Sequence, residues 1–295
     1  MMRSVSLLLL SMLLFGSCNT TRRTVRFGVL TDIHYAERDP LNDRYYAQAM
    51  DKTREAIDVF RQHPLDFVVE LGDLKDQSSD ADKTKTLNYL NRIEQSLQNC
   101  GKPVYHVLGN HDTDCISKQE FFSQITNPPA GKDKGFYSFR TKGVKFIVLD
   151  ANFNPDQSDY DSGNFDWTKA LIPDHELQWL EKELKKGDEP VIVFIHQLLD
   201  AGSGLDSGLY VSNAATVQQI LVRSGRVLAV FQGHHHGGHY SHKERIHYFT
   251  MPGVITGAHP DSNAYAIVEV APDGTVTIHG YRNCPSRTLL PPSQR

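Results

Sequence analysis

Short apolar runs recur along the chain, and most of them end at a turn that contains Gly, Asp, Asn or His. A representative run is Val25-Arg26-Phe27-Gly28-Val29-Leu30, which is rich in large aliphatic and aromatic side chains. Runs of this length and composition, bounded by turn residues, are typical of buried β-strands. The pattern predicts five such strands, at residues 25–30, 67–71, 104–108, 191–195 and 227–231.

Between these runs the apolar positions switch to helical spacing. Leu87, Leu90, Ile93 and Leu97, for example, would share one face of a helix. The spacing predicts helices at residues 41–61, 80–98, 116–125, 173–186 and 214–223. Further strands are expected as a hairpin at 135–139 and 144–149, and as a second sheet edge at 246–251, 263–270 and 274–280. This order predicts an α/β (mixed α+β) fold in which two mixed sheets are flanked by helices.

Polar residues with metal-ligand chemistry follow the five predicted strands. They occur as Asp32-Ile33-His34, Gly72-Asp73, Gly109-Asn110-His111-Asp112, His196 and Gly233-His234-His235-His236. The carboxyl ends of parallel strands meet at one edge of an open α/β sheet, so we expect these side chains to converge. Carboxylates, an amide oxygen and imidazoles suit two divalent ions such as Mn, Fe or Zn. Pairs of such ions are a recurring device for hydrolysing phosphate esters.

In this order, the five motifs resemble those of the calcineurin-like metallophosphoesterase superfamily over nearly the whole mature chain. The resemblance implies a four-layer αββα sandwich and two divalent metal ions. Two ions that share a water would lower its pKa, and the resulting hydroxide would attack phosphorus. The resemblance also implies the ligands: Asp32, His34 and His236 for one ion, Asn110, His196 and His234 for the other, and Asp73 as the bridge between them.

The residues that follow Asn110 are given other roles. The resemblance implies that His111 faces the substrate as an electrostatic clamp and proton donor. Asp112 would either orient the His111 imidazole or be a solvated turn carboxylate. His235 is given no ligand role, because alternation along extended backbone points its side chain away from the metals.

A finer resemblance is to the manganese-dependent ADP-ribose/CDP-alcohol diphosphatases. It implies that manganese is the favoured metal and that the substrate is a small nucleoside diphosphate conjugate. His34 is a departure, because animal members of that family carry Gln at this position. The resemblance rests on Asp32-Ile33-His34-Tyr35-Ala36, Arg44-Tyr45-Tyr46, Gln178-Trp179-Leu180, Gly237-Gly238-His239-Tyr240-Ser241, Gly253-Val254-Ile255-Thr256 and Pro260-Asp261-Ser262.

Four residues outside the ligand set are candidates for substrate contacts. Tyr35 would stack on a base or sugar, or else form a wall of the core. Arg44 would clamp the second phosphate of a diphosphate, or be a solvated arginine at the start of a helix. Asn152 belongs to a polar segment, residues 151–168, which has the length of a binding lid and could cover the leaving group. His239 is close enough in sequence to the last motif to touch substrate.

Composition limits the classes of function. The chain has 295 residues, of which 39% are hydrophobic and 22% charged, and its net charge is −4. Because all motifs must converge on one site, we expect a single domain at residues 24–285. The mild acidity and the lack of a basic run give no sign of a nucleic-acid partner. We expect a monomer that acts on a small-molecule phosphate ester or nucleotide conjugate.

The amino terminus has the features of an export signal. Arg3 precedes an apolar stretch at residues 5–15 that is too short to span a membrane as a helix. Leu14-Phe15-Gly16-Ser17-Cys18 resembles a bacterial lipoprotein cleavage box, which predicts a signal peptide at residues 1–17 and a lipid on Cys18. An ordinary secretory signal is the second interpretation. In both cases the mature protein is exported, and the first predicts a lipid anchor in the bacterial cell envelope as its link to the membrane.

The cysteines and the substrate class each fit more than one interpretation of the sequence. Of the three mature cysteines, Cys100 and Cys115 would form a disulfide, or all three would be free thiols. An exported phosphomonoesterase of broad specificity would use the same ligands as the diphosphatase. A non-catalytic protein that binds metal or phosphate is a third possibility, although decay of a catalytic site should have removed some of these ligands.

Overall fold

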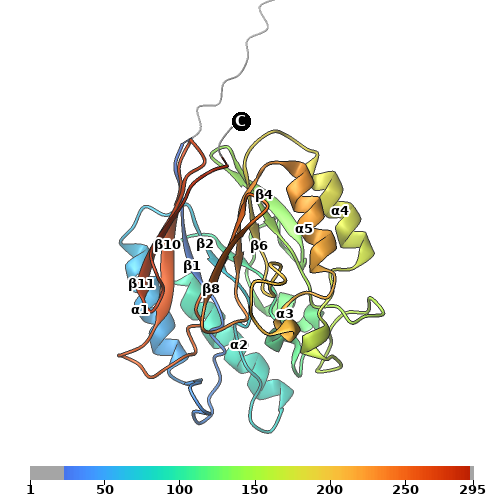
Figure 1. The fold of residues 1–295 in the computed structure, drawn as a ribbon. Helices are drawn as coiled ribbons and strands as arrows, with labels where there is room; N and C mark the ends of the chain where they lie inside the picture. Colours follow the sequence, from blue (N-terminus) through green and yellow to red (C-terminus); the bar gives the residue numbers. More distant parts are fainter. Residues whose placement is uncertain (1–22, 293–295) are drawn as a thin grey trace, which may run out of the picture.

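The computed structural model describes residues 23–292, which form two β-sheets of six strands each, packed face to face (Figure 1). The predicted signal peptide at residues 1–17 and Cys18 lie outside the described residues. No helix in the described part of the chain is long and apolar enough to cross a membrane.

The first sheet has the strand order β12-β11-β10-β1-β2-β3. Strands β1, β2 and β3 are parallel to one another, and β10 pairs antiparallel to β1. The parallel strands therefore end at one edge of the sheet, with their turns side by side. The strands are β1 (Val25–Leu30), β2 (Phe67–Glu70), β3 (Val104–His106), β10 (Ala264–Val270), β11 (Val276–Arg282) and β12 (Arg287–Leu289).

The second sheet has the order β4-β5-β6-β7-β9-β8. Strands β5, β6, β7 and β9 are parallel, whereas the edge strands β4 and β8 are antiparallel to their neighbours. The strands are β4 (Tyr137–Thr141), β5 (Val144–Val148), β6 (Val191–Phe194), β7 (Val227–Gln232), β8 (His239–Lys243) and β9 (Ile246–Thr250).

Aromatic side chains fill the space between the sheets. The ring of Phe27 in β1 stacks on Phe67 in β2, and it meets Phe146, Phe194 and Phe231 of the second sheet edge-on with ring centroids 5.5–5.8 Å apart. Contacts of this kind explain why the strands are apolar on both faces: the inner face packs on the other sheet, and the outer face packs on helices.

Helices cover the outer face of each sheet (Figure 1). One apolar cluster joins the first sheet to the first three helices, and another joins the second sheet to the last two. The layers run helix, sheet, sheet, helix, which confirms the predicted αββα sandwich. The helices are α1 (Ala49–Arg61), α2 (Lys83–Gln98), α3 (Lys118–Gln124), α4 (Asp174–Leu184) and α5 (Ala214–Ser224).

Some predicted elements need correction. The helix expected at 41–61 begins at Ala49, because Arg44 is held in isolated backbone bridges to Leu41 and Thr256. The strands expected at 246–251, 263–270 and 274–280 do not share one sheet edge. The first is β9 of the second sheet, and the other two are β10 and β11 beside β1. The edge strands β8 and β12 were not predicted, and the three described cysteines are free thiols.

Candidate metal centre

The five predicted ligand motifs meet at the edge where the parallel strands end, at the bottom of Figure 1. Four residues there have left-handed backbone, with φ of 50° at Asp32, 48° at His34, 57° at Asp73 and 68° at His234. Side chains larger than Gly adopt this conformation at a cost, so it persists where surrounding contacts impose it, often at functional sites. Each sharp turn aims the side chain away from the strand and into the shared space.

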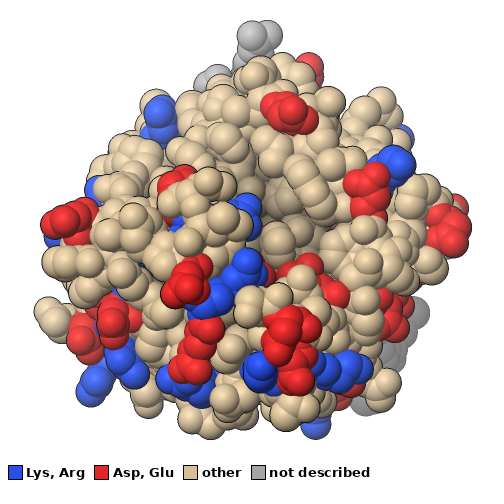
Figure 2. Space-filling view, turned by 90° about the horizontal axis from the view of Figure 1, so that it is seen from below, with Lys and Arg blue, Asp and Glu red and all other residues tan. Residues whose placement is uncertain are grey.

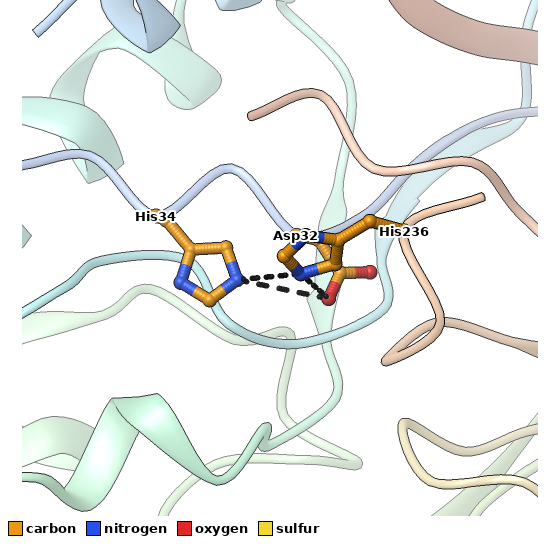
Figure 3. Close-up of side chains that lie close together, drawn as sticks. All are labelled: Asp32, His34 and His236. Carbon is orange, nitrogen blue, oxygen red and sulfur yellow. Dashed lines mark hydrogen bonds and ion pairs between the residues drawn. The ribbon is translucent and has the colours of Figure 1, made fainter. Parts of the chain in front are cut away.

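Asp32, His34 and His236 form a first triad of ligand atoms (Figure 3). The Nε2 atoms of His34 and His236 are 3.2 Å apart, and Oδ1 of Asp32 lies 3.3 Å from Nε2 of His236. Asp32 and His34 come from the end of β1, and His236 comes from the turn after β7. The triad therefore joins the two sheets.

Asp73, His196 and His234 form a second triad. Nε2 of His196 lies 3.1 Å from Oδ2 of Asp73 and 3.2 Å from Nδ1 of His234. The same Asp73 oxygen lies 3.4 Å from Nε2 of His34 in the first triad. A single carboxylate oxygen is therefore within reach of both triads, as a bridging ligand requires.

Atoms that face the centre lack protein partners. Oδ1 of Asp32 and Oδ1 of Asn110 are buried without a hydrogen bond in the described part of the chain. Their environment is not simply poor in donors, because the other Asp32 oxygen accepts from the Thr31 hydroxyl and from the backbone N–H of His234. Buried polar atoms without partners are destabilising, and a bound cation is a common explanation. The donors present therefore fit a pair of divalent metal ions.

The centre also attracts positive charge. Burial opposes a charge on the His34 imidazole, yet the carboxylates of Asp73, Asp32 and Asp76 outweigh it and raise its pKa to about 10. Burial would likewise raise the pKa of Asp73, but the imidazoles of His196, His111 and His34 hold it well below its usual range. The ionised carboxylates create a negative potential that a divalent cation would neutralise, and a bound cation would replace the proton on the His34 imidazole.

Carboxylate and carbonyl groups contact the Nδ1 atoms of candidate ligand imidazoles, on the side of each ring opposite Nε2. Nδ1 of His34 lies 3.4 Å from the Asp76 carboxylate, and Nδ1 of His196 lies 2.8 Å from the Leu71 carbonyl. The hydrogen bond to Leu71 fixes the His196 tautomer that leaves Nε2 free for a metal, and the Asp76 carboxylate provides negative charge beside Nδ1 of His34. The sequence analysis missed the role of Asp76, whose signal was a second acid three residues after Asp73.

His111 lies beside the first triad, with its ring centroid 4.8 Å from that of His34. Its side chain is about one-quarter exposed, at 28%, and its Nδ1 is 2.8 Å from the Asp114 carboxylate. Burial opposes protonation, but Asp114 and Asp73 outweigh it and raise the pKa of His111. The two carboxylates therefore favour the protonated form of this ring at the surface of the site.

The predicted role of Asp112 needs correction, since Asp114 and not Asp112 contacts the His111 imidazole. Asp112 is fully buried and accepts backbone N–H groups from two motifs. Its Oδ2 accepts from Gly109 at 2.8 Å and Asp73 at 3.0 Å, and its Oδ1 accepts from Leu74 at 2.9 Å. Asp112 is a positioning residue that ties the turns after β2 and β3 together.

These two turns also touch backbone to backbone. A Cβ atom on Gly109 would lie 2.2 Å from the backbone nitrogen of Asp73 and 2.3 Å from its Oδ1. No side chain larger than hydrogen fits there without moving the Asp73 turn. The glycine before Asn110 is therefore required by close packing against the Asp73 carboxylate.

Two predicted substrate contacts are corrected by burial. Tyr35 is 2% exposed and packs in the apolar cluster beneath α1 and α2, so its ring is a wall of the core. Asn152 is fully buried, donates to the Leu108 carbonyl and accepts from the Gln197 amide. It supports the turn that carries Asn110 and has no free atom for a substrate.

Arg44 and His239 remain near the site. The Arg44 side chain is half-buried. The pKa of the His236 imidazole is lowered by the burial of His236 itself, and the positive charges of His34 and Arg44 lower it further. His239 begins β8 beside His235 and belongs to neither triad. Figure 2 looks from below onto this edge of the molecule and shows a face that is hollowed near its middle.

Trp167 was missed by the sequence analysis. It lies in a short 3-10 helix (Trp167–Lys169), and its ring centroid is 5.5 Å from that of His234 at an angle of 70°. The segment that carries it was expected to be a lid. It contains four aromatic residues, Phe153, Tyr160, Phe165 and Trp167, and the sequence gave no signal of which ring would lie beside the metal centre.

Known proteins with similar sequences carry related names. A manganese-dependent ADP-ribose/CDP-alcohol diphosphatase of Bos taurus is 24% identical, over 92% of this chain and 95% of its own length. The enzyme of that name from Arabidopsis thaliana is 23% identical, over 83% of this chain and 90% of its own. The fold is similar to that of a dimetal phosphatase from Danio rerio, with a TM-score of 0.77 at 22% identity, over 91% of this chain and 99% of the other.

The family is shown by a match that spans most of the described chain. The model that describes calcineurin-like phosphoesterases matches residues 25–238, a range that contains all five ligand motifs. With the five ligand motifs at the ends of β1, β2, β3, β6 and β7, this match leads to one conclusion: the chain belongs to the calcineurin-like phosphoesterase family and is a hydrolase that acts on phosphate esters.

Proposed function

We propose that the chain is a dinuclear metal-dependent phosphoesterase that hydrolyses nucleoside diphosphate conjugates of the ADP-ribose or CDP-alcohol type. The observation that carries the dinuclear site is Oδ2 of Asp73, which lies 3.4 Å from Nε2 of His34 in the first triad and 3.1 Å from Nε2 of His196 in the second. The substrate class is supported by the names of relatives that match over most of this chain.

The donor atoms divide into two sets that share Asp73. Asp32, His34 and His236 would hold one divalent ion, and Asn110, His196 and His234 would hold the other. Manganese is favoured, since the relatives are named as manganese-dependent. When bound, two such ions supply a water of lowered pKa and neutralise charge on phosphoryl oxygens.

His111 would act on the substrate directly. Its Nδ1 is held by Asp114, so the Nε2–H is the group free to donate to a phosphoryl oxygen or to the leaving oxygen. The raised pKa of His111 favours the protonated form that can donate. A donor held in place before the reaction stabilises the transition state without reorganisation.

Arg44 would bind the second phosphate of the conjugate. No carboxylate of the described residues lies within 4 Å of its guanidinium, although the side chain is half-buried. The backbone of Arg44 bridges Thr256, in the segment whose Gly253 N–H donates to the His236 carbonyl. A guanidinium without a partner beside a metal site suits an anionic group of the substrate.

The test is a substrate screen with manganese-loaded protein of measured metal content. We expect two ions per chain and release of AMP from ADP-ribose or CMP from CDP-choline, with slow hydrolysis of AMP and of an aryl phosphate. Hydrolysis of monoesters alone would replace the diphosphatase with a phosphomonoesterase. Full metal content without turnover on any of these compounds would favour a binding protein.

A further inference from the structure

Trp167 is an exposed indole at the mouth of the metal centre. It is 44% exposed, and only Leu41 and Leu290 are comparably exposed large apolar side chains among residues 23–292. Its ring meets the imidazole of His234, a candidate ligand of the second triad, at 70°. A large aromatic ring open to solvent beside a catalytic centre is typical of a surface that receives a flat ligand.

The segment that carries Trp167 is fixed at several points. The Gly163 N–H donates to the Thr113 carbonyl at 3.0 Å, which ties the segment to the turn that contains His111. The rings of Tyr160 and Phe165 stack with centroids 4.1 Å apart, and the carboxylate of Asp166 accepts the N–H of Thr168. Trp167 is therefore held in place before any ligand arrives, which reduces the entropy lost on binding.

Trp167 and Arg44 lie beside opposite triads. Trp167 contacts His234 of the second triad. The backbone of Arg44 bridges Thr256, and three residues before Thr256 the Gly253 N–H donates to the carbonyl of His236, a member of the first triad, at 3.0 Å. Asp73, between the triads, marks the position of the phosphorus that reacts. The two neighbouring groups of a substrate would then extend in opposite directions, one toward a cation and the other toward an aromatic ring.

We propose that Trp167 is the stacking platform for the nucleobase of the substrate, an inference that rests on the proposed function. The second phosphate, being anionic, lies toward Arg44, and the base, being flat and apolar on its faces, lies on the free face of the indole. This fixes the direction of the substrate: the phosphorus between the triads is the one that carries the nucleoside.

The direction in which the substrate lies determines which phosphorus atom the water attacks. The oxygen of water bonds to the nucleoside-bearing phosphorus, and the bridging P–O bond breaks. The bridging oxygen leaves with the second phosphate, and the products are a nucleoside monophosphate and a phosphomonoester, with two protons released to solvent. No oxidant or further reactant is needed.

The first measurement uses fluorescence from Trp167 alone. The chain has two tryptophans, and Trp179 packs on Phe136 away from the triads. In Trp179→Phe, which should keep wild-type turnover, ADP-ribose and AMP should quench the remaining fluorescence, and ribose 5-phosphate should not. Unchanged fluorescence at ADP-ribose concentrations well above the KM overturns the proposal.

The second measurement compares Trp167→Ala with Trp167→Phe. Stacking of a base on an aromatic side chain corresponds to roughly a five- to hundredfold change in binding. The Ala variant should raise KM for ADP-ribose and CDP-choline by a factor in that range at similar kcat, Phe should restore much of the loss, and inhibition by pyrophosphate should not change. A wild-type KM in the Ala variant overturns the platform, whereas a wild-type protein that cleaves neither conjugate overturns the proposed function instead.

The third measurement tests the direction. Hydrolysis of ADP-ribose in water enriched in oxygen-18 should place the label in AMP. Label in ribose 5-phosphate would mean that water attacks the other phosphorus, and it would overturn the assignment of Trp167 to the base and Arg44 to the second phosphate.

Discussion

The floor of the metal centre, by which we mean the seven candidate ligands and His111, is largely enclosed. Five of the seven ligands are buried, and backbone groups hold the Asp32 carboxylate and the His196 imidazole. The rim, by which we mean Arg44 and Trp167, is more open: Arg44 is half-buried and Trp167 is exposed.

This difference separates two tasks. The floor is fixed by turns that cannot change without moving one another, so it sets the chemistry common to phosphate esters. The rim stands on irregular segments whose side chains face solvent, so it can set the leaving group and the base. Substitutions on the floor should therefore reduce turnover on every substrate, and substitutions at the rim should distinguish between substrates.

The largest effect is expected for Asp73→Asn. The amide keeps the shape of the side chain but loses the negative charge that would serve both ions. Since changes behind a ligand already cost about 10- to 100-fold in metal affinity or activity, loss of a shared ligand should exceed that. Metal analysis and turnover on conjugates and aryl phosphates measure it, with the exposed Asp80→Asn as a matched control. Wild-type turnover with two bound ions would contradict the bridging role.

His111→Ala should come next. Its metals should remain, because His111 belongs to no proposed ligand set, and turnover should fall by roughly 10²–10⁴ as for loss of a general acid. Asp114→Asn should show a smaller loss, since the imidazole would remain but its orientation and raised pKa would weaken. Loss of bound metal in His111→Ala would mean that His111 is a ligand and not a donor to the substrate.

Arg44→Ala should have the smallest effect and the most selective one. A hydrogen bond to a charged group contributes about 1.5–3 kcal/mol, which corresponds to roughly ten- to a hundredfold in kcat/KM for a diphosphate conjugate. Hydrolysis of a small aryl phosphate should change little. Arg54→Ala is the control, because Arg54 is an exposed arginine of α1 whose partner is Asp51. Equal losses on both substrates would show that Arg44 supports the fold and not the second phosphate.

The sequence was most informative about the floor. Buried parallel strands are continuously apolar, and ligand side chains stand out at their ends, so both the αββα layers and the convergence of Asp32, Asp73 and His196 could be predicted. The pattern could not assign β10 and β11 to the first sheet, because alternation along a strand does not identify its partner. The start of α1 depended on the Arg44–Thr256 bridge, which is a contact between distant segments.

Roles that depend on a single interatomic contact could not be predicted from the sequence. Asp112 and Asp114 are equally acidic and two residues apart, and only the coordinates show that the first accepts backbone N–H groups and the second contacts His111. The position of the Trp167 ring likewise could not be predicted, because it depends on the path of a long irregular segment. Export and the lipid on Cys18 stay predictions, which the mass of the mature amino terminus would check.

The contact between Gly109 and Asp73 has a consequence for how this protein can diverge. Two stretches of chain, one ending β2 and the other ending β3, share the Asp112 carboxylate and leave no room for a methyl group between them. A side chain larger than hydrogen at Gly109 would need the Asp73 turn to move, so substitutions in these two stretches are coupled. Substitutions at the rim can change the substrate one residue at a time, while this part of the floor stays the same.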